Sequence, residues 1–382
     1  MTLESILAVD TDAARRTVEA EIRNRMEAAG GKLVMAGAGA LGRATLTAAR
    51  RAGLTPVAFA DNNAALAGKE IEGVPVMPSA EAAERYRDDA VFAITVYTSE
   101  RMWAQYRQYG IEPVSFTQLA WAYPAAFMPY YAVEEPGMVR RAADAIRALL
   151  PLWADDASRT EYLAQLKWRT ALEPTVLGGN WPAKETLFAP ELIAFHDDES
   201  FVDCGAYDGD TVTQFLGLTK GRFKAISAYE PDLLNFAKLQ KLVTDLPDGQ
   251  RQRVRLYPNA LGSAPGRIQF DASGTVASAG GTGERWVDVV TLDETADVLE
   301  PTFIKMDIEG AEPDAIRGAA KIIERHKPIL AVCLYHVGRH LWEIPLMLAE
   351  LAPRHRLYLR RYSNDCWEQV CYAIPEHRAI VP

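Results

Sequence analysis

Short apolar runs recur along the chain, and most of them end at a glycine or an acidic residue. Runs of this length are typical of strands buried in a parallel sheet, where both faces are covered. They predict strands at 33–36, 56–60, 73–77, 91–96, 201–202, 225–229, 253–257, 286–292, 302–306 and 329–335, with 73–77 at a sheet edge. Two further runs, 355–362 and 369–374, flank Ser363-Asn-Asp and predict an antiparallel hairpin. A parallel α/β set that ends in a hairpin is therefore expected in the C-terminal part.

The alternation of strands and helices stops between residues 122 and 195. Tyr, Pro and Trp are frequent there, and Ser158 followed by Glu161 predicts a helix start of the capping-box type. This change of pattern and the length of 382 residues predict three parts. They are an N-terminal Rossmann-like α/β domain at 1–121, a mostly helical linker or lid at 122–195, and a larger α/β domain at 196–382.

A glycine-rich turn follows the first strand. Gly37, Gly39 and Gly42 stand in the pattern G-x-G-x-x-G, a helix over 43–52 follows, and Asp61 closes the next strand. Such glycines permit a tight turn and let a phosphate approach a helix N-terminus, and the acid can bind ribose hydroxyls. We therefore expect a nucleotide or sugar-nucleotide site at these residues. The alternative is a packing turn that binds no ligand.

A second unit has the same order of elements but a different charge. Asp203 ends its strand ahead of Gly205 and Gly209, a helix runs to about residue 216, and Glu230 closes the next strand. A carboxylate at the position of Asp203 would repel a pyrophosphate. It suits a ligand with positive charge near the turn and no phosphate. S-adenosylmethionine has this chemistry, because it carries an ammonium and a sulfonium.

Acidic residues also follow a central strand of the C-terminal half. Asp307, Glu309 and Glu312 lie on a strand-to-helix turn, because Pro313 fits the first turn of the next helix, and His336 ends the next strand. Ligands of open α/β sheets bind beyond the carboxyl ends of the strands. Asp307, Glu309 and His336 are therefore the candidate catalytic bases. The alternatives are orientation of a cofactor ammonium by Asp307 and a structural or substrate-contacting role for His336.

The neighbourhood of this turn raises two further points. Lys305, two residues before Asp307, is expected to pair with a carboxylate rather than to act in catalysis. Three acids so close together could hold a divalent metal, but metal ligands usually come from separate segments, so we predict no metal site. The small-residue stretch 272–283 is either a mobile loop over the acceptor or a plain connection.

Charge and cysteine content exclude several classes of protein. The chain has 41 Lys+Arg against 51 Asp+Glu, a net charge of −10, which argues against a nucleic-acid partner. Four scattered cysteines form no CxxC pair and are typical of free thiols in a reducing compartment. The sequence has no signal-peptide pattern and no apolar run long enough to cross a bilayer. We expect a cytoplasmic protein without a membrane partner. The sequence leaves open whether it forms a homo-oligomer.

Five motifs of the C-terminal half resemble the FkbM-type methyltransferase family. They are Phe201–Thr211, Tyr229–Asp232, Asn259–Gly262, Val290–Glu294 and Ile304–Glu312. The resemblance spans roughly 195–375 and implies a class I methyltransferase sheet and S-adenosylmethionine-dependent methylation, usually of a hydroxyl oxygen. It also implies the cofactor-binding residues, which are Asp203, Gly205, Ala206, Tyr207, Gly209, Glu230, Pro231, Asn259, Ala260 and Asp307.

The same resemblance implies a role for each part of that set. Asp203, Gly205 and Gly209 would shape the pocket for the methionine end. Glu230 would hold the ribose hydroxyls, and Asn259 would lie near the adenine together with its neighbour Ala260.

The first domain, over 32–78, resembles the nucleotide-sugar-binding domains that precede sugar acyltransferases and related polysaccharide enzymes. The leading hypothesis is therefore O-methylation of a sugar or glycosylated small molecule. The first alternative is a nicotinamide-dependent oxidoreductase that uses the glycine-rich turn at 37–42. A nucleic-acid methyltransferase and an inactive sensor or scaffold are weaker alternatives.

Overall fold

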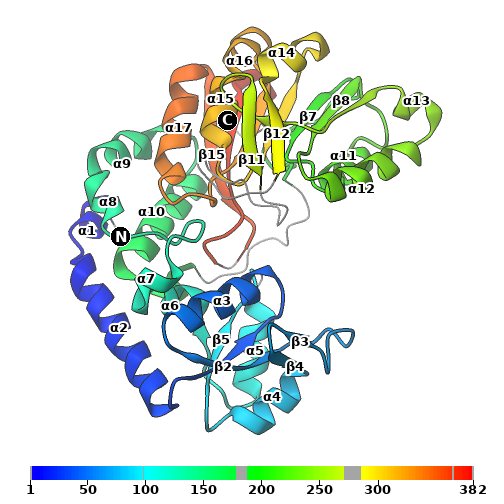
Figure 1. Ribbon diagram of the computed structural model, residues 1–382. Helices are drawn as coiled ribbons and strands as arrows, with labels where there is room; N and C mark the ends of the chain where they lie inside the picture. The colour runs from blue at the N-terminus through cyan, green and yellow to red at the C-terminus, as the bar shows by residue number, and fades with distance from the viewer. Residues whose placement is uncertain (1, 98, 178–186, 271–284, 364, 381–382) are drawn as a thin grey trace.

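A computed structural model describes residues 2–97, 99–177, 187–270, 285–363 and 365–380. The stretch 272–283, expected to be a loop, lies outside the described residues. The N-terminal lobe is built on a six-stranded sheet of order β3-β4-β2-β1-β5-β6, parallel except for β3 (Figure 1). Its strands are β1 (Lys32–Ala36), β2 (Thr55–Ala60), β3 (Glu70–Ile71), β4 (Val74–Met77), β5 (Val91–Ile94) and β6 (Val114–Ser115).

Helices cover both faces of this sheet, because successive residues of β1 point to opposite sides. Leu33 and Met35 pack toward α2 (Thr11–Ala28), α3 (Ala40–Arg51) and α6 (Phe116–Ala122). Val34 and Ala36 pack toward α4 (Ser79–Tyr86) and α5 (Glu100–Gln108). The expected edge strand at 73–77 is one position from the edge, which is formed by the short β3.

The C-terminal lobe carries a seven-stranded sheet of order β15-β16-β14-β13-β7-β8-β9. All of its strands run parallel except β16, which is antiparallel to both neighbours and closes the predicted hairpin. The strands are β7 (Ser200–Cys204), β8 (Ala225–Tyr229), β9 (Val254–Tyr257), β13 (Phe303–Met306), β14 (Ile329–Cys333), β15 (His355–Arg361) and β16 (Gln369–Pro375). The predicted fold class, a Rossmann-like methyltransferase sheet plus a smaller α/β unit, is confirmed.

Helices again cover both faces of this sheet. Phe201 and Phe303 pack toward α11 (Asp210–Leu218) and α12 (Leu233–Thr244). The opposite face is covered by α14 (Leu292–Thr295), α15 (Glu312–Arg317), α16 (Ala320–His326) and α17 (His340–Leu351), and the short α13 (Asp248–Arg251) lies before β9. Strand order reverses between β13 and β7, so a ligand crevice is expected at their carboxyl ends.

The predicted strand at 286–292 is present, but it lies outside the main sheet. This segment forms β12 (Arg285–Val290) in a separate three-stranded sheet with β10 (Ala260–Leu261) and β11 (Gly266–Phe270). The physical reason is its alternating burial, with Trp286 half exposed and Val287 buried. Such alternation belongs to a sheet with one wet face, whereas the central parallel strands are buried throughout.

A helical connector links the two lobes, and the N-terminal helix α1 (Leu3–Leu7) packs against it. It consists of α7 (Pro124–Phe127), α8 (Met138–Arg141), α9 (Ala143–Leu149) and α10 (Asp156–Ala171). The predicted start of α10 is wrong: Asp155 is the N-cap, and its carboxylate accepts the backbone N–H of Ser158 at 2.8 Å. None of the described helices is long and apolar enough to span a membrane.

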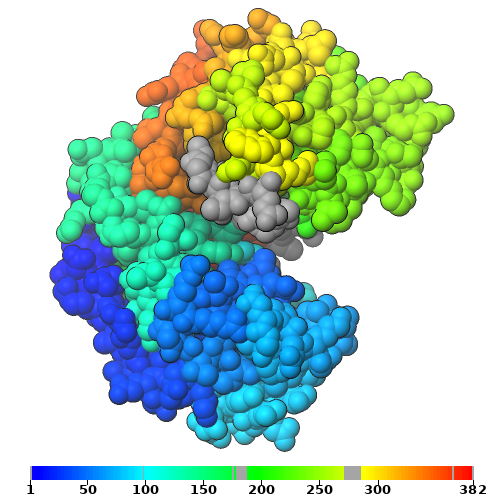
Figure 2. All heavy atoms as spheres, viewed as in Figure 1, coloured from blue at the N-terminus to red at the C-terminus, as the bar shows by residue number. Residues whose placement is uncertain are grey.

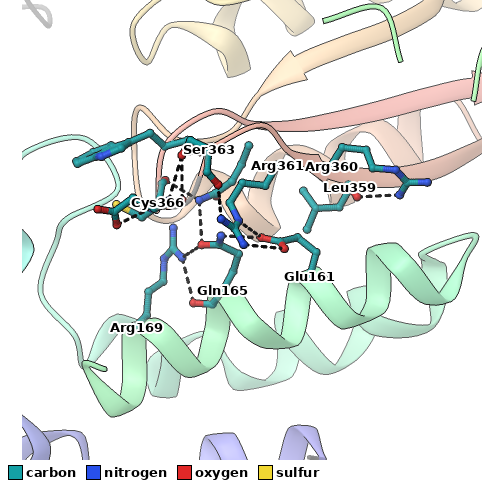
Figure 3. A network of polar contacts seen from close by, with 11 residues as sticks. Glu161, Gln165, Arg169, Leu359, Arg360, Arg361, Ser363 and Cys366 are labelled. Carbon is teal, nitrogen blue, oxygen red and sulfur yellow. Dashed lines mark hydrogen bonds and ion pairs between the residues drawn. The ribbon is translucent and has the colours of Figure 1, made fainter. Parts of the chain in front are cut away.

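A buried polar network holds α10 against the last hairpin (Figure 3). The Arg361 guanidinium donates to Glu161 at 2.7 Å, and both side chains are almost completely buried. Gln165 bridges the network, because it donates to Glu161 at 2.8 Å and accepts from Arg169 at 2.7 Å and Gln369 at 2.9 Å. The connector is therefore fixed to the C-terminal sheet by buried polar side chains that hydrogen-bond to one another.

Candidate active site

A cavity of about 720 Å³ lies at the carboxyl ends of β7, β8 and β13, in the space between the two lobes. Figure 2 shows the molecule hollowed between the N-terminal and C-terminal lobes. The C-terminal lobe supplies most of the lining, and the connector supplies Tyr130 and Tyr131. The N-terminal lobe contributes Tyr97 and the start of α3. This volume is in the range of small-molecule sites.

The turn after β7 forms part of the cavity wall at Gly205. Its φ is +83°, and a Cβ there would lie 2.0 Å from the Asp307 carbonyl oxygen. Only glycine lets the turns after β7 and β13 approach so closely. Gly209 also has a positive φ, +93°, but the space for its Cβ is bounded by flexible leucine side chains. Neither Gly209 nor Ala206 is part of the lining.

Asp203 lies beneath the cavity rather than in its wall. Its side chain is completely buried, and the Lys305 amine lies 3.0 Å from its carboxylate and donates to the Gly205 carbonyl at 2.7 Å. Although burial opposes it, the carboxylate of Asp203 raises the pKa of Lys305 above its usual value. The expected pairing of Lys305 is confirmed. Asp203 therefore supports the turn through Lys305 from below the lining.

The second wall of the cavity follows β8. Glu230 accepts the backbone N–H groups of Tyr207 and Asp232, both at 2.8 Å. Burial raises the pKa of Glu230 to about 7, against the effect of these two donors. Tyr207, Glu230 and Pro231 line the cavity. Asn259 and its neighbour Ala260 line it as well, next to the apolar side chains of β11.

The predicted base candidates come together at the carboxyl ends of β13 and β14. His336 Nε2 lies 3.2 Å from Asp307 Oδ1 and 3.7 Å from Glu309 Oε2. Tyr335 also donates to Asp307, at 3.0 Å. Asp307 and Glu309 line the cavity, whereas the side chain of His336 is only 1% exposed and does not. Burial raises the pKa of Glu309, and the positive charge of His336 opposes this.

Glu312 holds the other side of this cluster. It is fully buried and accepts His336 Nδ1 at 2.7 Å and the backbone N–H groups of Ile308 and Gly310 at 3.0 and 3.3 Å. Although burial opposes it, the charge of His336 lowers the pKa of Glu312 to about 2. In turn Glu312 raises the pKa of His336 well above its usual value, against burial. The neighbouring carboxylates therefore favour the charged form of His336.

Aromatic residues in the cavity wall were missed by the sequence reasoning. We call this set the aromatic chamber, and its members are Tyr97, Tyr130, Tyr131, Tyr335 and Trp367. The ring of Tyr131 lies 6.2 Å from Trp367 and 6.2 Å from Tyr335, between centroids. The hydroxyls of Tyr97 and Tyr130 share a hydrogen bond of 2.6 Å. The high Tyr content of the connector was the one signal that pointed to this wall.

The glycine-rich turn of the N-terminal lobe lies beside the cavity. Ala40, Arg43 and Ala44 of α3 are in the lining, but the predicted ligand residues are not. A Cβ at Gly42 would lie 2.0 Å from the Gly37 carbonyl oxygen, and a Cβ at Gly37, with φ +123°, would meet Val96. Close packing therefore explains why Gly37 and Gly42 are glycines, without a bound ligand.

The other two predicted residues of this turn differ from each other. A Cβ at Gly39 would meet nothing within 4 Å, so packing does not explain this glycine. Asp61 accepts the backbone N–H groups of Ala38 and Asn63, both at 2.8 Å. Its carboxylate therefore already closes the turn.

Metal ligands and cysteines are candidates for a second site among the described residues. Within the described residues, no group of three or more His, Cys, Asp and Glu side chains could hold a metal ion. The four cysteines form no disulfide and are buried; they are Cys204, Cys333, Cys366 and Cys371.

Comparison with known proteins supports the resemblance to FkbM-type methyltransferases. A model of the methyltransferase FkbM domain matches residues 203–366. The solved structure of methyltransferase FkbM from Methylobacillus flagellatus KT is 27% identical, covers 97% of this chain and 98% of its own, and superposes with a TM-score of 0.76. No curated protein matches the chain.

Two more distant structures are rRNA methylases with 12% identity. The one from Streptococcus thermophilus covers 50% of this chain and 94% of its own, with a TM-score of 0.30. The putative one from Clostridium thermocellum covers 48% and 90%, with a TM-score of 0.29. These scores are too low to carry an argument. The family model over the C-terminal lobe and the match over both lobes together support the expected resemblance to the FkbM-type methyltransferase family.

Proposed function

We propose that this methyltransferase moves a methyl group from S-adenosylmethionine to a hydroxyl oxygen of a sugar or glycosylated small molecule. The observation that carries the proposal is the cavity, which brings Glu230, Asp307 and Glu309 to one crevice at the point where strand order reverses.

The residues present fit the cofactor. Glu230 offers carboxylate oxygens to a ribose diol, and Asp307 offers one to an ammonium. The bare backbone of Gly205 leaves room for the methionine end. Ala260 and Phe270 provide an apolar surface for the adenine. Lys305 is held by Asp203 below the turn, so the described residues at this end of the cavity offer a phosphate no unpaired basic group.

The protein's own part in the reaction is to orient the acceptor and to take its proton. S-adenosylmethionine supplies a methyl group on a sulfonium, which leaves as a neutral thioether. We assign the base to Glu309, because it lines the cavity and its pKa is raised toward neutrality. Asp307 lines the cavity 3.2 Å from His336 and would orient the cofactor ammonium. Good alignment supplies up to about 7–11 kcal/mol.

Two observations support a sugar as the acceptor. The aromatic chamber adjoins Asp307 and Glu309, and aromatic rings suit the apolar faces of sugars. The N-terminal lobe, which resembles nucleotide-sugar-binding domains in sequence, brings the start of α3 and Arg43 to the same cavity. A sugar nucleotide held there would reach the chamber without leaving the cavity.

The test is a ligand panel on the full chain. Thermal unfolding is measured with S-adenosylhomocysteine, NAD⁺ and UDP- and GDP-sugars. A ligand at 100 times its Kd adds about 2.7 kcal/mol to the free energy of unfolding. We expect stabilisation by S-adenosylhomocysteine, reduced in Asp307→Asn. Asp314→Asn is the matched control, because Asp314 is an exposed acid in the first turn of α15, just after the turn that carries Asp307, and it pairs with Arg317. Stabilisation by NAD⁺ alone would refute the proposal.

A further inference from the structure

Tyr131 brings the helical connector into contact with the acidic turn of the C-terminal lobe. It lies between α7 and α8, and it lines the cavity together with Glu309. Its hydroxyl hydrogen-bonds to the Glu309 carboxylate. The carboxylate that we assign as the base therefore has a partner from outside 203–366, the segment that matches the FkbM domain model.

Packing on the Tyr131 ring fixes the place of this hydroxyl. The ring centroid lies 4.9 Å from that of Tyr130 and 5.7 Å from that of the His336 imidazole. The ring centroids of Tyr335 and Trp367 are both 6.2 Å away. Tilted and edge-on contacts of this kind are the preferred arrangements of aromatic pairs. With neighbours on several sides, the ring has few orientations open to it, so the hydroxyl stays directed at the acidic turn.

The backbone is left-handed at both ends of this contact. The φ angle is +48° at Tyr131 and +58° at Glu309, a region that side chains of this size rarely adopt. Such a conformation persists only where the surrounding structure holds it. At Glu309 the flanking turn is held by Glu312, which accepts the backbone N–H groups of Ile308 and Gly310. Strained backbone gathers at functional sites, and here it is found in both partners of one hydrogen bond.

The hydrogen bond acts on a carboxylate that is only partly exposed. Glu309 Oε2 is buried 3.7 Å from His336 Nε2, while 34% of the side chain is exposed, in the cavity lining. A donor to a carboxylate favours its charged form, so the Tyr131 hydroxyl opposes the rise in the pKa of Glu309 that burial causes. A base must be ionised to accept a proton, so this donor favours the reactive form. Other titratable groups that interact with Glu309 are Asp307, Glu312, His336, Tyr335, Tyr97 and Tyr130.

We propose that Tyr131 is a positioning residue for methyl transfer, whose phenol holds the Glu309 carboxylate toward the acceptor. The proposal rests on the proposed function, in which Glu309 takes the proton of the acceptor hydroxyl. In that step the proton passes to Glu309, the methyl group passes from the sulfonium to the acceptor oxygen, and the phenol O–H of Tyr131 stays intact. The connector would thus complete an active site whose other reacting groups belong to the C-terminal lobe.

The experiment follows the titration of Glu309 in the full chain without ligand, by carbon NMR of protein labelled at the glutamate carboxyl carbon. The Glu309 resonance is the one that disappears in Glu309→Gln. Tyr131→Phe keeps the ring and removes the hydroxyl, so the midpoint of this titration should move to higher pH. Tyr362→Phe is the matched control, because the Tyr362 hydroxyl shares a hydrogen bond of 2.7 Å with that of Tyr372, and neither residue lines the cavity. Its midpoint should stay where it is in the unaltered chain.

The outcomes separate this proposal from the proposed function. An unchanged or lower midpoint in Tyr131→Phe, or an equal shift in both variants, overturns the proposal. If Tyr131→Phe does not fold, the unaltered chain grown with 3-fluorotyrosine decides: its phenols are stronger donors and should move the midpoint to lower pH, and an unmoved midpoint overturns the proposal. Calorimetry of the unaltered chain with S-adenosylhomocysteine is independent of this titration, and absence of binding there would refute the proposed function itself.

Discussion

Gly205→Ala tests the reasoning about the cavity wall most directly. The new Cβ would lie 2.0 Å from the Asp307 carbonyl oxygen, in a backbone conformation with φ +83°. The left-handed conformation costs about 1–2 kcal/mol and the overpacking about 1–3 kcal/mol. The lower entropy of the unfolded chain returns about 0.4–1 kcal/mol. We therefore expect a net loss of about 1–5 kcal/mol of unfolding free energy in urea, with weaker binding of S-adenosylhomocysteine.

Two other glycines separate the causes of this loss. Gly73 also has a positive φ, +77°, but a Cβ there would meet nothing within 4 Å, so Gly73→Ala isolates the conformational cost. Gly217 lies inside α11 with open space around it, and Gly217→Ala should stabilise the protein slightly. The reasoning is refuted if Gly205→Ala costs no more than Gly73→Ala, or if it leaves cofactor-product binding unchanged.

Three further predictions concern buried charge. Lys305→Met leaves Asp203 buried without its partner and should cost about 3–5 kcal/mol in urea unfolding at pH 7; an unchanged midpoint would contradict this. In the folded protein the pKa of Glu230 is raised to about 7. Its stabilising contribution to the free energy of unfolding is therefore complete below pH 4.5 and is lost as the pH rises to 7. Urea unfolding measured between about pH 4.5 and 8 should show a loss of about 3 kcal/mol in unfolding free energy. The Glu230→Gln variant should not show this loss. Glu312, with a pKa lowered to about 2, has the opposite sign: its contribution is present above pH 4.5 and is lost toward pH 2. Acid unfolding of Glu312→Gln should therefore begin from a lower stability and show a shallower slope.

Local sequence signals predicted those features that depend on neighbours along the chain. Both glycine-rich turns and the acidic turn at Asp307 follow from the order of strand, turn and helix within one βα unit. The pairing of Lys305 follows from its position on a buried strand, where an unpaired amine is too costly. The hairpin at the end of the chain was visible from its apolar runs and its turn residues.

Features that depend on distant partners were not predictable in this way. Asp203 has the family motif in its expected place, yet nothing local tells that its carboxylate faces Lys305 rather than the cavity. Ser158 and Glu161 have the spacing of a capping box, but Glu161 instead pairs with Arg361 on another element. The aromatic chamber combines residues of three parts of the chain, so it exists only once both lobes are folded.

The contact between α10 and the last hairpin has a consequence for how the protein is made. Glu161 and Arg361 are 200 residues apart, so one is translated long before the other. Trp367 and its neighbour Cys366 also complete a hydrophobic cluster that includes α2 and β1 of the N-terminal lobe. A nascent chain would therefore leave Glu161 uncompensated and part of that cluster open until its final strands emerge from the ribosome. Closure of the molecule would be a late, long-range event, and a premature stop before β15 would leave these surfaces to chaperones and proteases.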